Sequence, residues 1–311
     1  TSAALPVWFY DAYVKQSPVR LAPGVTAIIG GGGNSLIVEG KREALLVDSK
    51  FPPGSRVLAH WIKRHVRQPI RYVVNTHYHY DHAQGNDLYP QAQIMAHELA
   101  PELMLGQDGH HWSRNLAALP TRKVASAGES VHLDDVEVVL EHPGHAHTRA
   151  DLVVYLPKHD VLATGDLFFH TFHPFFDLSK AGASIEGLIS AIETLAIKYP
   201  TATVIPGHGP VAKSTDLRNY AAYLDTLRRS ALSVIDTGGT EDDAAAQAPE
   251  VERKVLPSFH HGEVSWATKE SAARSVFRLV LAERRAKESA HPAALATPVE
   301  NRIEALAGGQ A

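Results

Sequence analysis

The sequence predicts an α/β protein in which helices cover β-sheets, followed by a helical extension at the C-terminal end. Two observations predict this architecture. From residue 24 to about residue 210, short β-branched runs alternate with longer segments whose apolar residues recur at helical spacing. After Pro210 the strand-like runs stop, and two long amphipathic segments follow. With 44% hydrophobic and 21% charged residues, the 311-residue chain has an ordinary globular composition.

The first strands have the pattern of a β-hairpin. Residues 35–39 and 44–48 are β-branched and apolar, and the turn residues 40–42 lie between them. A strand at residues 24–29 precedes them and leads into the glycine run 30–33. This run lacks both the Gly-Lys-Ser/Thr of a phosphate loop and the G-x-G-x-x-G spacing, so it predicts a tight turn. Further strands are predicted at residues 70–74, 92–96, 136–141, 152–156, 161–163 and 203–205.

Helices are predicted where apolar residues recur every three to four positions. In the α/β part these segments are residues 55–67, 98–105 and 185–198. In the C-terminal part they are residues 214–235 and 268–287, with a polar stretch at residues 237–252 between them. From residue 289 onward the chain is rich in Ala, Gly and Pro, and we expect this tail to be loosely held.

Charge and cysteine content exclude several classes of protein. The 30 Lys and Arg against 34 Asp and Glu give a net charge of -4 and no broad positive field for nucleic acid. No apolar run approaches the roughly 20 residues of a membrane-spanning helix. The absence of cysteine excludes disulfides, thiolate zinc sites, iron–sulfur clusters and a cysteine nucleophile. We therefore expect a small-molecule partner, no nucleic acid and no membrane. We also expect a periplasmic or cytoplasmic location, with a slight preference for the periplasm.

A cluster of potential metal ligands follows the strand predicted at residues 70–74. Residues 76–82 read Thr-His-Tyr-His-Tyr-Asp-His. Because alternate residues of an extended segment point to one side, His77 and His79 can meet one ion, and Asp81 and His82 can face a second. The alternative is an exposed polar loop, but three histidines and an aspartate at this spacing favour a metal site.

Three later strand ends supply further candidate ligands. Residues 142–148, His-Pro-Gly-His-Ala-His-Thr, follow the strand at 136–141. Asp166 follows the strand at 161–163, and His208 follows the strand at 203–205. In each case a glycine-bearing turn presents one type of ligand, and the recurrence favours a shared site.

These motifs resemble the metallo-β-lactamase fold superfamily. The H-x-H-x-D-H signature is present at residues 77–82, and the later His, Asp and His motifs follow in the family's order. The resemblance, which covers residue 24 to about residue 210, implies an αββα sandwich with two zinc ions at one sheet edge. It implies His77, His79 and His147 for the first zinc, Asp81, His82 and His208 for the second, and Asp166 near both. We expect a catalytic domain at residues 1–212, a helical extension packed on it at 213–288, and a tail at 289–311.

Within residues 142–148 the third histidine ligand is His147 or His145. His147 is preferred because Thr148 and the following apolar strand match the family's His-Thr turn. The resemblance implies that a hydroxide shared by the two zincs attacks a polarised carbonyl, while Asp81 holds the nucleophile and relays a proton. Nitrogen and oxygen ligands suit zinc and also admit iron or manganese.

The resemblance implies a hydrolase, and the substrate must be argued from the site. Our first expectation is β-lactamase-type hydrolysis of a cyclic amide. Against it, Phe169 stands where β-lactamases with a cysteine ligand carry the lysine that anchors the substrate carboxylate. The alternative is a lactone, ester or glyoxalase-II-like thioester hydrolase, which the helical extension favours, although residues 83–86 read Ala-Gln-Gly-Asn instead of Gly-Gly. A nuclease of the same fold is the least favoured reading. The aromatic run 168–176 could line a pocket mouth or form a buried loop.

Overall fold

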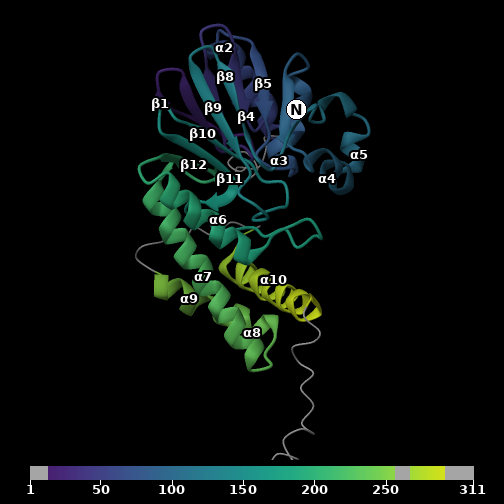
Figure 1. The fold of residues 1–311 in the computed structure, drawn as a ribbon, viewed down its shortest axis with the longest axis vertical. Helices are drawn as coiled ribbons and strands as arrows, with labels where there is room; N and C mark the ends of the chain where they lie inside the picture. The colour runs from purple at the N-terminus through teal and green to yellow at the C-terminus, as the bar shows by residue number, and fades with distance from the viewer. Residues whose placement is uncertain (1–12, 256–266, 291–311) are drawn as a thin grey trace, which may run out of the picture.

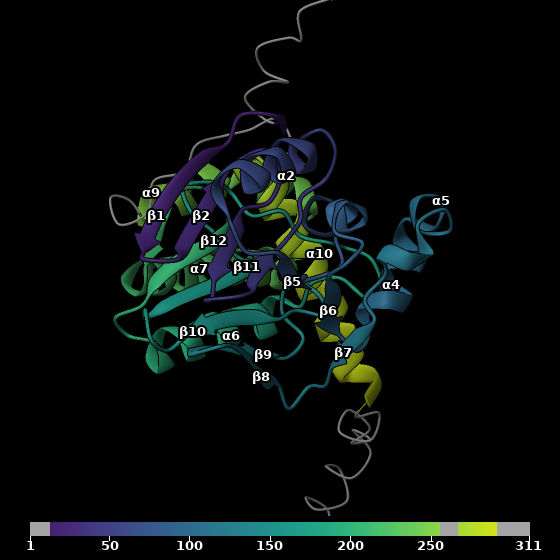
Figure 2. The same cartoon turned by 90° about the horizontal axis from the view of Figure 1, so that it is seen from above.

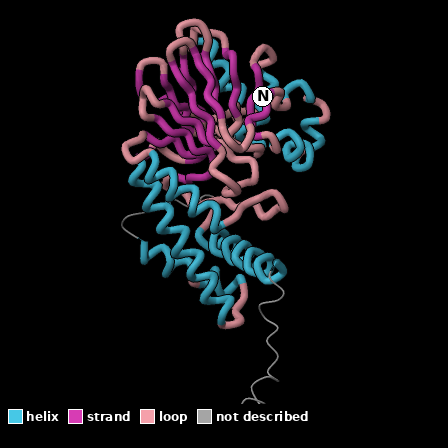
Figure 3. The backbone as a smooth tube through the Cα atoms, in the orientation of Figure 1, coloured by secondary structure: helices cyan, strands magenta, loops and turns pink. Residues whose placement is uncertain are grey.

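The computed structural model describes residues 13–255 and 267–290, which form two β-sheets packed face to face with helices outside them (Figures 1 and 3). The first sheet has seven strands in sequence order: β1 Ser17–Ala22, β2 Val25–Ile29, β3 Ser35–Glu39, β4 Ala44–Val47, β5 Ile70–Val74, β6 Gln93–His97 and β7 Arg122–Val124. The second has the order β13-β12-β11-β10-β9-β8: β8 Glu129–Leu133, β9 Val136–Glu141, β10 Val153–Leu156, β11 Val161–Phe169, β12 Thr203–His208 and β13 Ala212–Lys213.

Strand direction changes within each sheet. The strands β1 to β4 pair antiparallel, which confirms the predicted hairpin, and β4 to β7 pair parallel. In the second sheet only β11 and β12 are parallel. Parallel neighbours end at the same edge, so the residues that follow β4 and β5, and β11 and β12, come together in space.

The core has three apolar layers, as a four-layer sandwich requires. Side chains such as Leu36 and Val154 fill the space between the sheets. On the outer face of the first sheet, helix α2 (Gly54–His65) packs Leu58 and Ile62 against strand residues such as Leu46. On the outer face of the second sheet lies α6 (Ile185–Lys198) (Figure 2). The predicted αββα sandwich is therefore confirmed.

The C-terminal helices lie at one end of the sandwich, beneath α6 in Figure 1. They are α7 Ser214–Asp236, α8 Glu241–Ala246, α9 Ala248–Val255 and α10 Lys269–Ala290. One continuous apolar cluster runs from β11 and β12 through α6 into α7, α9 and α10. The remaining helices are α3 Tyr80–Ala83, α4 Ala100–Gln107 and α5 Gly109–Trp112, with 3-10 turns at Gln84–Leu88 and Leu116–Ala118. Among the described helices, none is long and apolar enough to cross a bilayer.

Several elements differ from the sequence-based expectation. The strands β1, β7, β8 and β13 were not predicted, and the stretch 237–252, expected to be only polar, contains α8 and most of α9. These two helices bury small apolar residues such as Ala244 and Val251, and their charged residues face solvent. Strand β11 continues to Phe169 because residues 167–169 are buried beside β12, so Asp166 lies inside the strand and not after it. Helix α10 includes residues 289 and 290, and residues 291–311 of the predicted tail lie outside the described residues.

Candidate metal centre

The structure brings all seven predicted ligand residues together at one edge of the two sheets. They form two groups, and within each group one ligand atom per residue lies within 4.8 Å of the others. The first group is His77, His79, His147 and Asp166, and the second group is Asp81, His82 and His208.

Strand ends supply these side chains. His77 and His79 lie in the loop that follows β5, and Asp81 and His82 lie in the short helix α3 that continues this loop. His147 lies in the connection between β9 and β10. Asp166 lies in β11, and His208 is the last residue of β12. The parallel pairing of β11 and β12 brings Asp166 and His208 to the same edge of the sheet, although the residue paired with His208 is Phe169.

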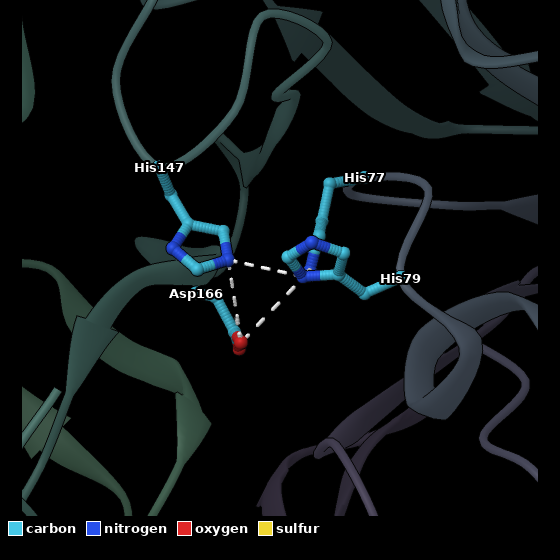
Figure 4. Close-up of side chains that lie close together, drawn as sticks. All are labelled: His77, His79, His147 and Asp166. Atoms are coloured by element: carbon cyan, nitrogen blue, oxygen red, sulfur yellow. Dashed lines mark hydrogen bonds and ion pairs between the residues drawn. The ribbon is translucent and has the colours of Figure 1, made fainter. Parts of the chain in front are cut away.

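In the first group, three imidazole nitrogens converge on a common point (Figure 4). Nε2 of His77 and Nε2 of His147 lie 3.0 and 3.2 Å from Nδ1 of His79. Oδ2 of Asp166 lies 3.9 Å from the His77 nitrogen and 3.6 Å from the His147 nitrogen. Ligand atoms about 2.0–2.1 Å from a tetrahedral zinc ion are separated by roughly 3.4 Å, so this spacing fits such an ion.

The second group has more carboxylate oxygen. Oδ2 of Asp81 lies 3.2 Å from Nε2 of His208 and 3.7 Å from Nε2 of His82. Oδ1 of Asp166, the oxygen that does not face the first group, lies 3.1 Å from Nε2 of His82 and 3.5 Å from Nε2 of His208. Asp166 therefore presents one oxygen to each group.

Two buried atoms at this junction make no hydrogen bond among the described residues, namely Nε2 of His82 and Oδ1 of Asp166. Buried polar atoms without hydrogen bonds are costly unless another partner, such as a cation, satisfies them. The nitrogen and oxygen donors, their convergence and these two atoms therefore fit a pair of divalent metal ions. The donor set suits zinc and is also compatible with iron or manganese.

Hydrogen bonds behind the histidines aim their free nitrogens at the junction. Nδ1 of His82 donates to Oδ2 of Asp48 (2.7 Å), which leaves Nε2 to face the second group. The hydroxyl of Thr76 also donates to Oδ2 of Asp48 (2.7 Å) and accepts from Nδ1 of His77 (3.1 Å). Such outer partners fix the tautomer and the ring orientation of ligating histidines.

Asp177 performs the same task for His79. Its Oδ2 accepts hydrogen bonds from Nε2 of His79 (3.1 Å) and from the hydroxyl of Tyr78 (2.6 Å). Burial opposes the charge of this carboxylate, but the hydrogen bonds from His79 and Tyr78 hold the pKa of Asp177 well below its usual range. The carboxylate therefore stays charged, and Nδ1 of His79 remains free to bind a cation.

The pKa values of the histidines separate the two groups. In the first group, burial lowers the pKa of His147 to about 3 and that of His77 well below its ordinary value. In the second group, the charge of Asp166 outweighs burial and raises the pKa of His208 to about 9. Asp166 and Asp81 likewise raise the pKa of His82 well above its ordinary value. Without an ion, His77 and His147 of the first group are consequently neutral, whereas the second group is a set of ion pairs.

Other residues singled out in the sequence lie outside the two groups. Nε2 of His145 contacts the carbonyl of Gly182 at 2.7 Å, so the structure places His147, and not His145, in the first group. Phe169 is buried, and its ring stacks on His208 with centroids 5.2 Å apart. The aromatic run is mostly buried, but Phe175 is 46% exposed, and its ring centroid lies 6.3 Å from that of His79.

Two residues that make buried hydrogen bonds near the site were not singled out in the sequence. Asp177 lies 98 positions from His79, and Lys50 lies directly beyond the strand that leads to Asp48. Neither belongs to a ligand motif. The one available signal for Lys50 was a lysine three residues after a fully apolar strand and two residues before a pair of prolines.

Comparisons with known proteins identify the family of this chain. The family model for the metallo-beta-lactamase superfamily matches residues 28–208, which include all seven residues. A metallo-beta-lactamase type 2 of Bacillus cereus is 26% identical over 181 residues, which cover 57% of this chain and 67% of that protein. A similar enzyme of Bacillus sp. (strain 170) is also 26% identical, over 180 residues that cover 57% of this chain and 67% of that enzyme.

Solved structures share the fold. A metallo-beta-lactamase from Pontibacter korlensis superposes with a TM-score of 0.56 at 24% identity, covering 68% of this chain and 99% of that chain. The sec-alkylsulfatase Pisa1 from Pseudomonas sp. superposes with a TM-score of 0.64 at 18% identity, covering 85% of this chain and 50% of that chain. The second superposition thus includes part of the chain beyond the α/β sandwich.

Proposed function

This chain belongs to the metallo-beta-lactamase superfamily of metal-dependent hydrolases, and from this premise we propose that it uses two zinc ions to hydrolyse a small cyclic amide of the β-lactam type. The observation that carries the two-ion part is the position of Asp166. Its two oxygens face different ligand groups, at 3.6 Å from His147 and 3.1 Å from His82. A carboxylate in this position can bridge two ions.

Two divalent ions held by these seven residues would lower the pKa of a bound water to about 7 and would polarise the bond that is attacked. The chain's own residues hold and orient the reactants. Asp81 is the best placed general base, because its carboxylate lies at the open side of the second group with 17% of the side chain exposed. The charges of His82 and His208 outweigh burial and keep the pKa of Asp81 below its usual value, so it is ready to accept a hydrogen bond from the nucleophile.

The β-lactam assignment draws its support from the curated relatives, which are named metallo-beta-lactamases at 26% identity. A second candidate is an ester, lactone or thioester. It is favoured by Phe169, which fills the position of the expected carboxylate anchor with a buried ring, and by the exposed ring of Phe175 beside His79. An apolar side chain at the rim would suit an uncharged substrate better than an anionic one.

The test is turnover by protein loaded with zinc, iron or manganese, beside a chelator-stripped control. The substrates are a chromogenic cephalosporin, a lactone, a glutathione thioester, a sec-alkyl sulfate and single-stranded nucleic acid. Chelator-sensitive cephalosporin hydrolysis supports the first proposal. Activity confined to the lactone, the thioester or the sulfate ester replaces it with the second candidate or a related esterase, and activity on nucleic acid alone refutes both.

Asp81→Asn is the variant that tests the proposed base. We expect kcat to fall about 100-fold. Asp160→Asn, a change outside the two groups, is the matched control and should leave kcat unchanged. An unaltered kcat in Asp81→Asn would remove Asp81 from the mechanism.

A further inference from the structure

Lys50 is a fully buried lysine, which is rare in proteins because the charged ammonium must leave water. Its Nζ donates hydrogen bonds to three backbone carbonyls, those of Ile28 (3.2 Å), Gly30 (2.7 Å) and Gly33 (2.5 Å). An ammonium has three donors, so this cradle uses all of them. These hydrogen bonds offset part of the cost of burial, which still lowers the pKa of Lys50 to about 7, and an apolar side chain could not supply them.

The carbonyls of Gly30 and Gly33 belong to one turn, and Ile28 lies two residues before it. We call residues 30–34 the glycine loop. Gly30, Gly31 and Gly32 have φ values of +90°, +70° and +100°, a left-handed conformation that favours glycine. Residues in this conformation do not form the regular hydrogen bonds of a strand or a helix. The buried Lys50 ammonium instead donates to the carbonyls of the loop.

The other side of the glycine loop lies against the second ligand group. The amide of Gly33 donates to the carbonyl of Asp81 (3.2 Å). A Cβ atom on Gly33 would lie 2.3 Å from Cε1 of His82, so the loop backbone and the His82 ring are in direct contact. The loop therefore limits where both residues can move.

Asn34 extends the same contact to the third member of the group. Its amide nitrogen donates to the carbonyl of Gly207 (2.7 Å), and its side-chain Nδ2 donates to the carbonyls of Pro206 (2.9 Å) and Gly209 (2.8 Å). These three residues surround His208 in the sequence. Oδ1 of Asn34 accepts a hydrogen bond from the amide of Gly30 (3.0 Å), which links the two ends of the glycine loop.

The glycine loop thus touches Asp81, His82 and the turn that carries His208. We propose that Lys50 is a positioning residue for the second metal ion: its ammonium fixes the glycine loop, and the loop holds the second ligand group at the spacing the ion requires. The first group has a different support, because Asp177 and Thr76 hold its histidines. The inference rests on the proposed two-ion site.

The experiment is a titration of chelator-stripped protein with Co²⁺, followed by calorimetry and by the visible d–d absorption of the bound ion. Lys50→Met keeps a long side chain and removes the three donors. We expect the first ion to bind within about threefold of the wild-type affinity, and the second ion to bind 10- to 100-fold more weakly, with altered d–d bands.

Two further variants make the result specific. Gly33→Ala pushes on His82 from the opposite side of the loop, and it should also weaken the second ion selectively. Asp177→Asn is the matched control, because it perturbs a hydrogen bond to His79, and it should weaken the first ion. If Lys50→Met does not fold, Gly33→Ala and Asn34→Ala decide the question by the same titration.

The outcomes are distinct. If wild-type protein binds two ions and the loop variants weaken both ions equally, or neither, the positioning role of Lys50 is refuted while the proposed function stands. If wild-type protein binds fewer than two ions, the two-ion function itself fails, and the inference fails with it. The inference is supported if the Lys50 and Gly33 variants bind only the second ion more weakly and Asp177→Asn binds only the first ion more weakly.

Discussion

The two ligand groups share one aspartate but differ in burial and in charge. All four members of the first group are buried, whereas Asp81 and His208 of the second group keep 17% and 14% of their side chains exposed. Burial keeps His77 and His147 neutral, and the carboxylates make His82 and His208 cationic. A buried neutral group is ready to take an ion, while an open ion-paired group must release protons first. The first group therefore suits retention of an ion, and the more open second group suits contact with a substrate.

The largest effect should come from the residue that joins the two groups. Asp166→Ala removes both oxygens at once and leaves Nε2 of His82 without its nearest carboxylate oxygen. We expect kcat/KM to fall at least about 1000-fold and the metal content to drop at both sites. Metal analysis after gel filtration, together with kinetics, checks this prediction. If only one ion were lost, Asp166 would belong to a single group.

Histidine deletions in each group should have unequal effects. His147→Ala opens the buried group, and we expect about a 1000-fold loss of kcat/KM with loss of the more tightly held ion. His208→Ala removes a partly exposed ligand, and we expect about a 100-fold loss with one ion retained. Equal losses in the two variants would contradict the contrast between the groups.

Metal affinity should depend on pH more steeply in the second ligand group than in the first. In the absence of metal the pKa of His208 is about 9 and that of His82 is also raised well above its ordinary value, so an ion must displace the protons of both histidines. Affinity at the second group should therefore fall at least about tenfold, and up to about 100-fold, for each pH unit between 8.5 and 6.5. The pKa of His147 is about 3, so the affinity of the first group should change little over this range. Competition titrations with a chromophoric chelator at several pH values measure both slopes, and parallel slopes would contradict the comparison.

The smallest effect concerns a buried histidine outside both groups. His97, at the end of β6, stacks on His142 with centroids 4.2 Å apart, and burial lowers its pKa to about 4. The unfolded chain, with an ordinary pKa near 6.5, binds this proton first as pH falls, so the stability that neutral His97 supplies is lost between pH 6.5 and pH 4. His97→Gln removes this dependence.

Urea unfolding of the wild type and of His97→Gln, in chelator at pH 7.5 and pH 5, separates the contribution of His97 to stability from that of bound metal. The wild-type advantage over His97→Gln should shrink by about 2 kcal/mol at the lower pH. An advantage that grew on acidification would mean that His97 is protonated in the folded protein. The result measures how burial alone, without a metal ion, makes the free energy of unfolding depend on the protonation of a histidine.

The candidate ligand residues could be predicted from the sequence because each one lies within a few positions of a recognisable apolar run. His77 to His82 lie within six positions, and His208 comes three positions after the apolar run 203–205, at the end of β12. Asp166 was found for the same reason, although the strand continues past it, since pairing with β12 keeps residues 167–169 extended.

The supporting residues could not be predicted in this way. Asp177 reaches His79 only because the loop after β11 folds back over the site, and Lys50 gains its role only from carbonyls that point inward. Long-range contacts of this kind have no periodic signal. The short helices α8 and α9 were missed because their buried faces consist mainly of alanines, which add little to an apolar pattern.

The continuous apolar cluster beneath the second sheet has a consequence for cooperativity. Residues of β11 and β12, α6 and the C-terminal helices bury one another, with Leu162, Leu195 and Leu224 in the same cluster. The second sheet and the extension should therefore unfold as one unit, and their slowest amide hydrogens should exchange together. A fragment that ended near residue 212 would expose the apolar face of α6. The extension can therefore not be exchanged between relatives as a module without redesign of the surface it covers.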